Sequence, residues 1–209
     1  MKRVYIDLDS TLYNTEIIKQ NMNHIIADAV CERVSNQDKN IVIGEIKEAK
    51  ASGVKSVIGL CKFFEGKYSL EKDFIRKKFE DFLSKGEELL YFDSIDFLKR
   101  LSQKGFEVNI LTYTSQEDYD YQMLKVMGAK ISGFVDNIFM CTKKKGELGL
   151  DYANAYFVDD NPKELVSLFN AGVSPDRLLR IKRDGAGYSD VIISEFEAKE
   201  YTNLKDIEI

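Results

Sequence analysis

Two carboxylates stand at the end of the first hydrophobic run of the chain, in the stretch VYIDLDSTLYNT that begins at Val4. Three apolar residues lead into Asp7, and a second acid, Asp9, follows two residues later. Carboxylates rarely enter a protein core unless they are paired or bind a metal ion. The spacing therefore raises the question of which other charged groups could meet this pair.

Polar side chains also follow three later hydrophobic runs. FEVNILT ends at Thr112, VDNIFMC is followed by three lysines, and NAYFVDD ends in Asp159 and Asp160. In a parallel sheet the carboxyl ends of all strands lie at one edge. We therefore expect the acids, the threonine and a lysine to gather there.

Such a gathering has a definite chemistry. Crowded carboxylates repel one another unless a cation neutralises them. An all-oxygen site suits Mg²⁺, and a nearby lysine balances the cluster and binds an anion. This is the equipment for phosphoryl transfer, in which one carboxylate can also act as a covalent nucleophile.

The elements that must position these groups can be read from hydrophobic periodicity. Residues 3–8 form a short run that predicts a buried strand. The next section is helical in pattern, and none of it has the β-branched alternation of a strand. Its expected helices cover residues 15–35, 41–50, 53–65 and 70–84.

After Gly86 helical and strand patterns alternate. SIDFLKRLSQKG and QEDYDYQMLKVMG predict helices capped by Gly105 and Gly128. NPKELVSLFNAG predicts a helix with Asn161 as its N-cap, Pro162 at its first position and Gly172 after its end. RLLRI and DVIIS predict further short strands.

This alternation predicts an α/β fold, with a doubly wound parallel sheet and an inserted α-helical cap subdomain. The predicted core comprises residues 1–13 and 89–209, and the predicted cap comprises residues 14–88. The cap is expected over the carboxyl ends of the strands, where ligands bind in open α/β sheets.

Composition narrows the class of protein. The 209 residues carry a net charge of −5 at pH 7, which argues against a nucleic-acid partner. No apolar run is long enough to span a membrane, and the three separated cysteines are typical of a cytoplasmic protein with reduced thiols. With a single histidine, His24, acid–base chemistry must fall to other side chains.

The ordered set of motifs resembles the haloacid dehalogenase (HAD) superfamily, and specifically its phosphatase branch. VYIDLDSTL is similar to the first motif, Asp-x-Asp-x-Thr after a strand, and VNILTYT is similar to the second. TKKKG supplies the lysine of the third, and YFVDDNPKE is similar to the fourth. The resemblance implies a HAD-like Rossmannoid core with a helical cap inserted after the first motif.

The resemblance also implies roles for single residues. Asp7 would be the nucleophile, and Asp9 would be the general acid and then the base. Thr112 would bind the transferring phosphoryl group. Mg²⁺ would be held by Asp7, by Asp160 and by the backbone carbonyl of Asp9, with Asp159 in support.

Three features of the sequence depart from the family's pattern. The usual Lys-Pro of the third motif is absent. Lys145 is favoured as the active-site lysine because it precedes a glycine, with Lys144 second, and Lys143 also remains open. Tyr113 replaces a smaller residue after Thr112, which predicts a narrower substrate pocket. The link before the paired acids is short, so its helix must be small or missing.

Glu164 has two interpretations. It lies where some relatives place a further acid, but it also stands three residues after Asn161, which predicts a capping box.

The leading functional interpretation is a Mg²⁺-dependent phosphate monoester hydrolase that acts on a small phosphorylated metabolite through an aspartyl-phosphate. A phosphomutase or phosphotransferase on the same core is an alternative, and a receiver-like phosphorylated switch protein is an alternative from another class. A dehalogenase is disfavoured because that branch lacks the acid that Asp9 supplies. Nucleotides, sugar phosphates and small organic phosphates remain open as substrates, as does the oligomeric state.

Overall fold

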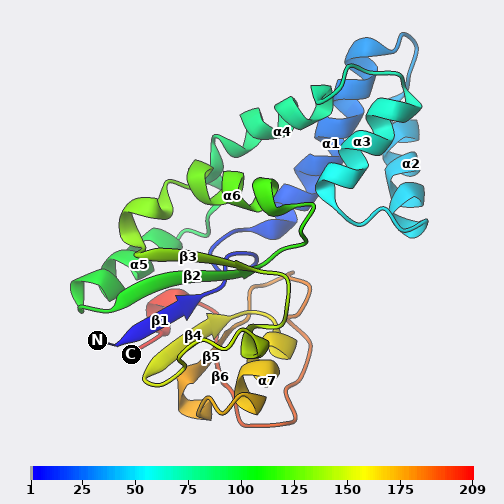
Figure 1. The fold of residues 1–209 in the computed structure, drawn as a ribbon. Coiled ribbons are helices and arrows are strands. Elements are labelled where there is room, and N and C mark those ends of the chain that lie inside the picture. Colours follow the sequence, from blue (N-terminus) through cyan, green and yellow to red (C-terminus); the bar gives the residue numbers. More distant parts are fainter. Residues whose placement is uncertain (1) are drawn as a thin grey trace. The chain divides into compact units, whose positions relative to one another are not determined.

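The computed structural model describes residues 2–209 and contains one six-stranded parallel sheet (Figure 1). The strand order is β3-β2-β1-β4-β5-β6, which places the first strand in the middle of the sheet. The predicted doubly wound α/β fold is therefore confirmed. The strands are β1 (Arg3–Ile6), β2 (Glu107–Tyr113), β3 (Asn137–Cys141), β4 (Ala155–Asp159), β5 (Leu178–Ile181) and β6 (Lys199–Tyr201).

The central strands are buried on both faces, as their continuous apolar runs require. Tyr5 of β1 stacks on Phe157 of β4, with ring centroids 5.1 Å apart, in a cluster that includes Leu165 and Leu168. Side chains alternate along a strand, so Val4 and Ile6 point to the opposite face. This packing fixes the register that brings Ile6 opposite Ile110 and Val158.

Two helices flank the sheet, α5 (Ser94–Gln103) and α7 (Pro162–Asn170). The predicted caps are confirmed: Gly105 and Gly172 have φ values of 75° and 94°, and the Asn161 side chain accepts a hydrogen bond from Lys163 N. Short 3₁₀ turns also occur along these segments of the chain: η2 (Ile131–Phe134), η3 (Lys145–Glu147), η4 (Pro175–Arg177) and η5 (Leu204–Asp206).

The chain divides into two compact units, and the sheet lies in the unit of residues 1–16, 89–114 and 131–209. The other unit is helical and comprises residues 17–88 together with 115–130. It contains α2 (Lys39–Ala51), α3 (Val57–Lys67), α4 (Phe74–Leu83) and α6 (Tyr119–Gly128). It also contains α1 (Thr15–Arg33) from residue 17 onward and η1 (Gly86–Leu89) up to residue 88.

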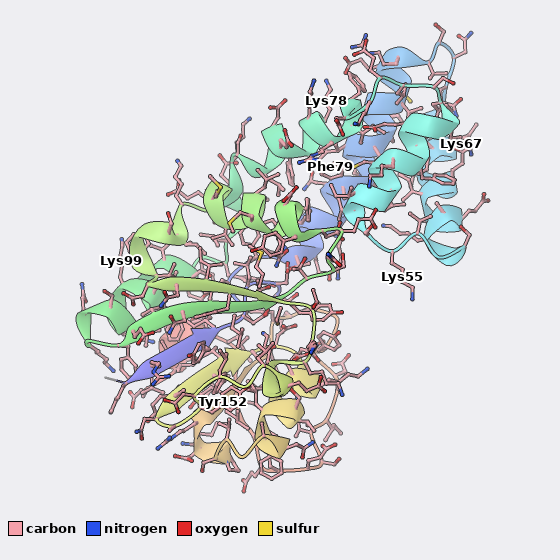
Figure 2. All side chains as sticks on the ribbon, in the orientation of Figure 1. Lys55, Lys67, Lys78, Phe79, Lys99 and Tyr152 are labelled. Carbon is pink, nitrogen blue, oxygen red and sulfur yellow. The ribbon has the colours of Figure 1, made fainter. Side chains whose placement is uncertain are left out.

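Local contacts explain why α6 belongs to the helical unit. The Asp118 carboxylate accepts hydrogen bonds from Val57 N and Ile58 N at the start of α3. Tyr121 meets Phe79, which is labelled in Figure 2, edge to face at 6.2 Å. Within residues 2–209, no helix combines the length and the apolar character that a membrane span needs.

Two details of the predicted elements are wrong. Gly128 does not cap α6 from outside, because it is the last residue of the helix, and the residue with a left-handed φ is Lys130. Gly128 is needed for a close approach instead, because a Cβ there would lie 1.8 Å from the carbonyl oxygen of Leu83. DVIIS forms no strand, and the sixth strand is β6, whose KEY sequence has too little hydrophobic pattern to reveal it.

Candidate active site

The carboxyl end of β1 carries Asp7, directly after Ile6. The amide of Asp7 donates to Val158 O of β4 at 2.9 Å, which fixes its backbone against the neighbouring strand. Asp159 is the last residue of β4 and Asp160 follows it. Because β1 lies between β2 and β4, the strand order itself brings these acids to the same edge as Thr112 of β2.

Lys145 lies at the centre of this group. Its Nζ is 2.6 Å from Asp7 Oδ1 and 2.6 Å from Asp159 Oδ2, and its side chain is only 2% exposed. Lys143 and Lys144 are exposed. Of the three adjacent lysines, the structure brings Lys145 alone to the acids.

The backbone of Lys145 is fixed from two sides. Its N–H donates to Glu164 Oε2 at 2.8 Å, and its carbonyl accepts from Tyr152 Oη at 2.6 Å (Tyr152 is labelled in Figure 2). Gly146 allows η3 to lie against α7, because a Cβ there would be 2.0 Å from Ser167 O. The amine therefore reaches the acids from a backbone that is already rigid.

Three carboxylates form a group suited to a metal ion. Asp7, Asp159 and Asp160 each offer an oxygen within 4.8 Å of the others, and all three are buried. Both Asp159 oxygens have partners, Oδ2 the Lys145 amine and Oδ1 the N–H of Asn161 at 2.9 Å. The Asp160 carboxylate has no hydrogen-bond or ion-pair partner within residues 2–209, although it is only 6% exposed.

A buried carboxylate without a partner is costly unless a cation neutralises it. The donor set is all oxygen, which fits a hard divalent cation such as Mg²⁺. Asp160 and Asp7 are the side chains best placed to hold the ion, and Asp159 is better explained as the group that orients Lys145.

Burial and mutual repulsion alter the protonation of this group. Burial raises the pKa of Asp7 to about 7, against the opposing charge of Lys145 and with the help of Asp159 and Asp9. Burial and the charges of Asp7 and Asp159 raise the pKa of Asp160 to about 9. Burial alone would lower the pKa of Lys145, but Asp159 and Asp7 outweigh it and raise that pKa above its usual value.

Asp9 is not one of the three clustered carboxylates, although its charge acts on Asp7 and Asp160. It lies in a tight turn of residues 8–13 that we call the Asp9 turn. Leu8 O accepts hydrogen bonds from the amides of Leu12 and Tyr13, at 3.0 and 2.8 Å. Ser10 has a left-handed φ of 58°, which reverses the chain directly after Asp9. The hydroxyl of Thr15 donates to Asp9 Oδ1 at 3.0 Å and so fixes the orientation of the carboxylate.

The family model of the haloacid dehalogenase-like hydrolases matches residues 1–172, which include every residue of this site. The chain belongs to this family. No protein of curated function gives a significant sequence match.

Solved structures of haloacid dehalogenase-like proteins share the fold at low sequence identity. A HAD phosphatase from Thermococcus onnurineus is 20% identical with a TM-score of 0.65, over 98% of this chain and 95% of that one. A candidate haloacid dehalogenase-like hydrolase from Burkholderia xenovorans is 15% identical with a TM-score of 0.70, over 98% and 94%. The candidate HAD-hydrolase YfnB of Bacillus subtilis, solved with bound magnesium, is 15% identical with a TM-score of 0.58, over 98% and 95%.

The remaining predicted site residues of this haloacid dehalogenase-like hydrolase are placed as follows. Thr112 is 1% exposed near the end of β2, and Tyr113 after it is 53% exposed. The link between Lys145 and β4 contains only the short turn η3, so the predicted loss of a helix there is confirmed.

The predicted capping box is wrong. The N–H of Asn161 donates to Asp159 Oδ1, and the Glu164 carboxylate accepts from the Lys145 amide instead. Sequence reasoning also missed Tyr152 and Thr15. Both residues contact the site through hydrogen bonds that no local sequence pattern predicts. Glu164, in contrast, lies at a position where some relatives place a further acid.

We expect the metal-free protein to lose stability as pH rises. An aspartate in the unfolded chain titrates near 3.8, whereas the pKa is raised to about 7 for Asp7 and to about 9 for Asp160. Between these values the folded protein keeps protons that the unfolded chain has released, so the free energy of unfolding falls.

Melting in EDTA across this pH range measures the effect, and Asp160→Asn is the matched control because its amide cannot ionise. The melting midpoint of the wild type should fall relative to the variant as pH rises, and Mg²⁺ should raise it most at high pH. Parallel curves for the two proteins would contradict the assignment.

Proposed function

We propose that this haloacid dehalogenase-like hydrolase is a Mg²⁺-dependent phosphate monoester hydrolase that forms an aspartyl-phosphate on Asp7. The observation that carries the proposal is the buried Lys145 amine bonded to both Asp7 and Asp159, beside the unpartnered carboxylate of Asp160. Three buried carboxylates beside one lysine form an all-oxygen donor set that suits a divalent cation and the phosphate ester it would bind.

The chemistry divides into two steps. A carboxylate oxygen of Asp7 attacks phosphorus, the bond from phosphorus to the leaving oxygen breaks, and Asp9 donates a proton to that oxygen. Asp9 then removes a proton from water, which attacks phosphorus and releases phosphate from Asp7. Bound Mg²⁺ would be held by Asp7, Asp160 and the Asp9 carbonyl, and it would supply charge neutralisation at the phosphoryl oxygens.

The other residues support these steps. Lys145 compensates charge and orients Asp7, and Thr112 binds the phosphoryl group. Tyr113, exposed directly after Thr112, and Lys144, exposed next to Lys145, would meet the rest of the substrate. We propose a small phosphorylated metabolite as that substrate, since a net charge of −5 does not favour a nucleic-acid partner.

Metal dependence is the first test. Hydrolysis of an aryl phosphate should vanish in EDTA and return with Mg²⁺, because without the cation the acids of the site repel a phosphate dianion. The Asp160→Asn variant should need far more Mg²⁺ for half-maximal rate, while Asp136→Asn, which changes an acid of the same unit outside the cluster, should behave as wild type. Undiminished turnover in chelator would contradict the metal assignment.

The same assay, extended to a panel of metabolites, separates the alternatives. A mutase would interconvert phosphosugar isomers in the presence of a bisphosphate activator and release little phosphate. A receiver-like switch would retain the phosphoryl group without turnover. The proposal expects steady release of inorganic phosphate.

A further inference from the structure

The Asp9 turn is held from outside by hydrogen bonds to two successive carbonyls. Thr11 O accepts from Nη2 of Arg183 at 2.9 Å. Leu12 O accepts from the hydroxyl of Ser94 at 2.8 Å and from the amide of Tyr91 at 2.9 Å. Arg183, which is distant in the sequence, therefore fixes the main-chain carbonyl of the residue two positions after Asp9.

Arg183 is itself fixed by a bidentate ion pair. Its Nη1 and Nη2 lie 2.9 and 2.8 Å from the two oxygens of Asp93, and both side chains are buried. Asp93 Oδ2 also accepts from the amide of Leu204, and the guanidinium lies 4.1 Å from the ring centroid of Tyr91. The two Asp93 oxygens and the Tyr91 ring fix the orientation of the planar Arg183 guanidinium. In this orientation Nη2 points at Thr11 O.

A buried ion pair of this kind is weak evidence for stability. Removing two charges from water costs about as much as their attraction returns, and hydrophobic replacements are often neutral. The feature that apolar side chains could not supply here is a donor directed at a main-chain carbonyl. Arg183 lies beyond residues 1–172, the part that the family model matches.

We propose that Arg183, oriented by Asp93, is a positioning residue for the general acid Asp9. The inference rests on the proposed function, because it assigns the effect to proton donation. Asp9 has its carboxylate bonded to Thr15 and its backbone in a turn with a left-handed residue, so its place depends on both ends of that turn. Loss of the bond from Arg183 to Thr11 O would let the C-terminal part of the turn move, and Asp9 with it.

The chain offers a matched control in Arg180. It is also fully buried, pairs with Glu200 at 2.6 Å, donates to Tyr188 O, and shares with Arg183 a buried Nε that has no partner within residues 2–209. Neither of these bonds reaches a residue of the Asp9 turn. Arg180→Met therefore removes a buried guanidinium and its ion pair with Glu200, whose side chain is 38% exposed, without touching the turn.

Leaving-group dependence distinguishes loss of the acid from general damage. Arg183→Met should slow an alkyl phosphate, whose leaving oxygen needs a proton, by about 10² in kcat, the scale expected when a catalytic group is misplaced by about 1 Å. Formation of the phosphoenzyme from an aryl phosphate with a good leaving group should change little, as should KM. Asp9→Asn should show the same pattern more strongly, by about 10²–10⁴.

Arg183→Lys keeps the charge and is the second variant if Arg183→Met fails to fold. It should show the same leaving-group pattern, because one amine cannot bond both Asp93 oxygens and Thr11 O in the geometry of the fork. Amide exchange at Leu12 and Tyr13, measured on resting protein, should accelerate in the Arg183 variants and stay unchanged in Arg180→Met.

Each outcome has a defined meaning. Equal losses in the rate of phosphoenzyme formation from the two substrates, or losses that match Arg180→Met, would overturn the positioning role. A wild-type protein that hydrolyses neither substrate would instead overturn the proposed function. In that case unchanged exchange at Leu12 and Tyr13 would show separately that Arg183 does not hold the turn.

Discussion

Asp7→Asn should abolish turnover, with kcat lower by about 10⁶, the loss typical of removing a covalent nucleophile. The amide lacks a nucleophilic oxygen, and no other carboxylate can replace it. Asp159 has both oxygens bonded, and Asp160 is the group best placed to hold the metal ion. Single-turnover kinetics with an aryl phosphate measure the loss.

The variant should nevertheless fold. Asp7 is neutral in part near pH 7, since burial raises its pKa to about 7, and an amide of the same shape removes repulsion with Asp159 and Asp160. Its melting midpoint in EDTA should therefore equal or exceed that of the wild type. Turnover within tenfold of wild type in a folded variant would mean that Asp7 is not the nucleophile.

Lys145→Met should remove activity and also destabilise the fold. The substitution leaves Asp7 and Asp159 buried at 2.6 Å from a position that no longer carries a positive charge. Breaking a buried pair by removing one partner costs about 3–5 kcal/mol. The loss should be smaller at low pH, where the two carboxylates can take up protons instead.

Lys144→Met is the control, because it removes the neighbouring lysine whose side chain is exposed. Urea unfolding at two pH values gives the free energy of unfolding for both variants. Equal and small effects of the two substitutions would contradict the assignment of the buried cation to Lys145.

The first five strands along the chain, and the polar residues that follow them, could be predicted because they depend on local pattern. The apolar runs before Asp7 and before the pair Asp159-Asp160 each predict a buried strand that ends in acidic residues. A parallel sheet then requires their convergence, whatever the detailed packing. The edge at which the site lies follows from the sequence for this reason.

The partners within the site could not be predicted in the same way. Lys145 is buried and Lys144 is exposed where η3 begins at Lys145. The position of η3 depends on the close approach of Gly146 to Ser167 O and on the bond from the Lys145 amide to Glu164. The three lysines are identical, and in the sequence only the glycine after Lys145 distinguished it from its neighbours. Glu164 matched a capping box by spacing, but the Asn161 amide found a better acceptor in Asp159.

Contacts between distant segments explain the remaining differences. Residues 115–130 pack with residues 17–88 because Asp118 caps α3, and β6 forms through pairing of Tyr201 with Ile181 rather than through its own composition. Arg183 and Asp93 are 90 residues apart, so no local sequence pattern predicts their ion pair.

Trapping the phosphoenzyme tests the central claim most directly. The protein would be mixed with Mg²⁺ and an aryl phosphate, quenched within one turnover, and reduced with borohydride, which converts an aspartyl-phosphate to homoserine. Peptide mass spectrometry should find homoserine in place of Asp7, dependent on Mg²⁺ and increased in Asp9→Asn, which slows hydrolysis of the intermediate. Reduction at another residue, or turnover with no reducible intermediate in either protein, would contradict covalent catalysis by Asp7.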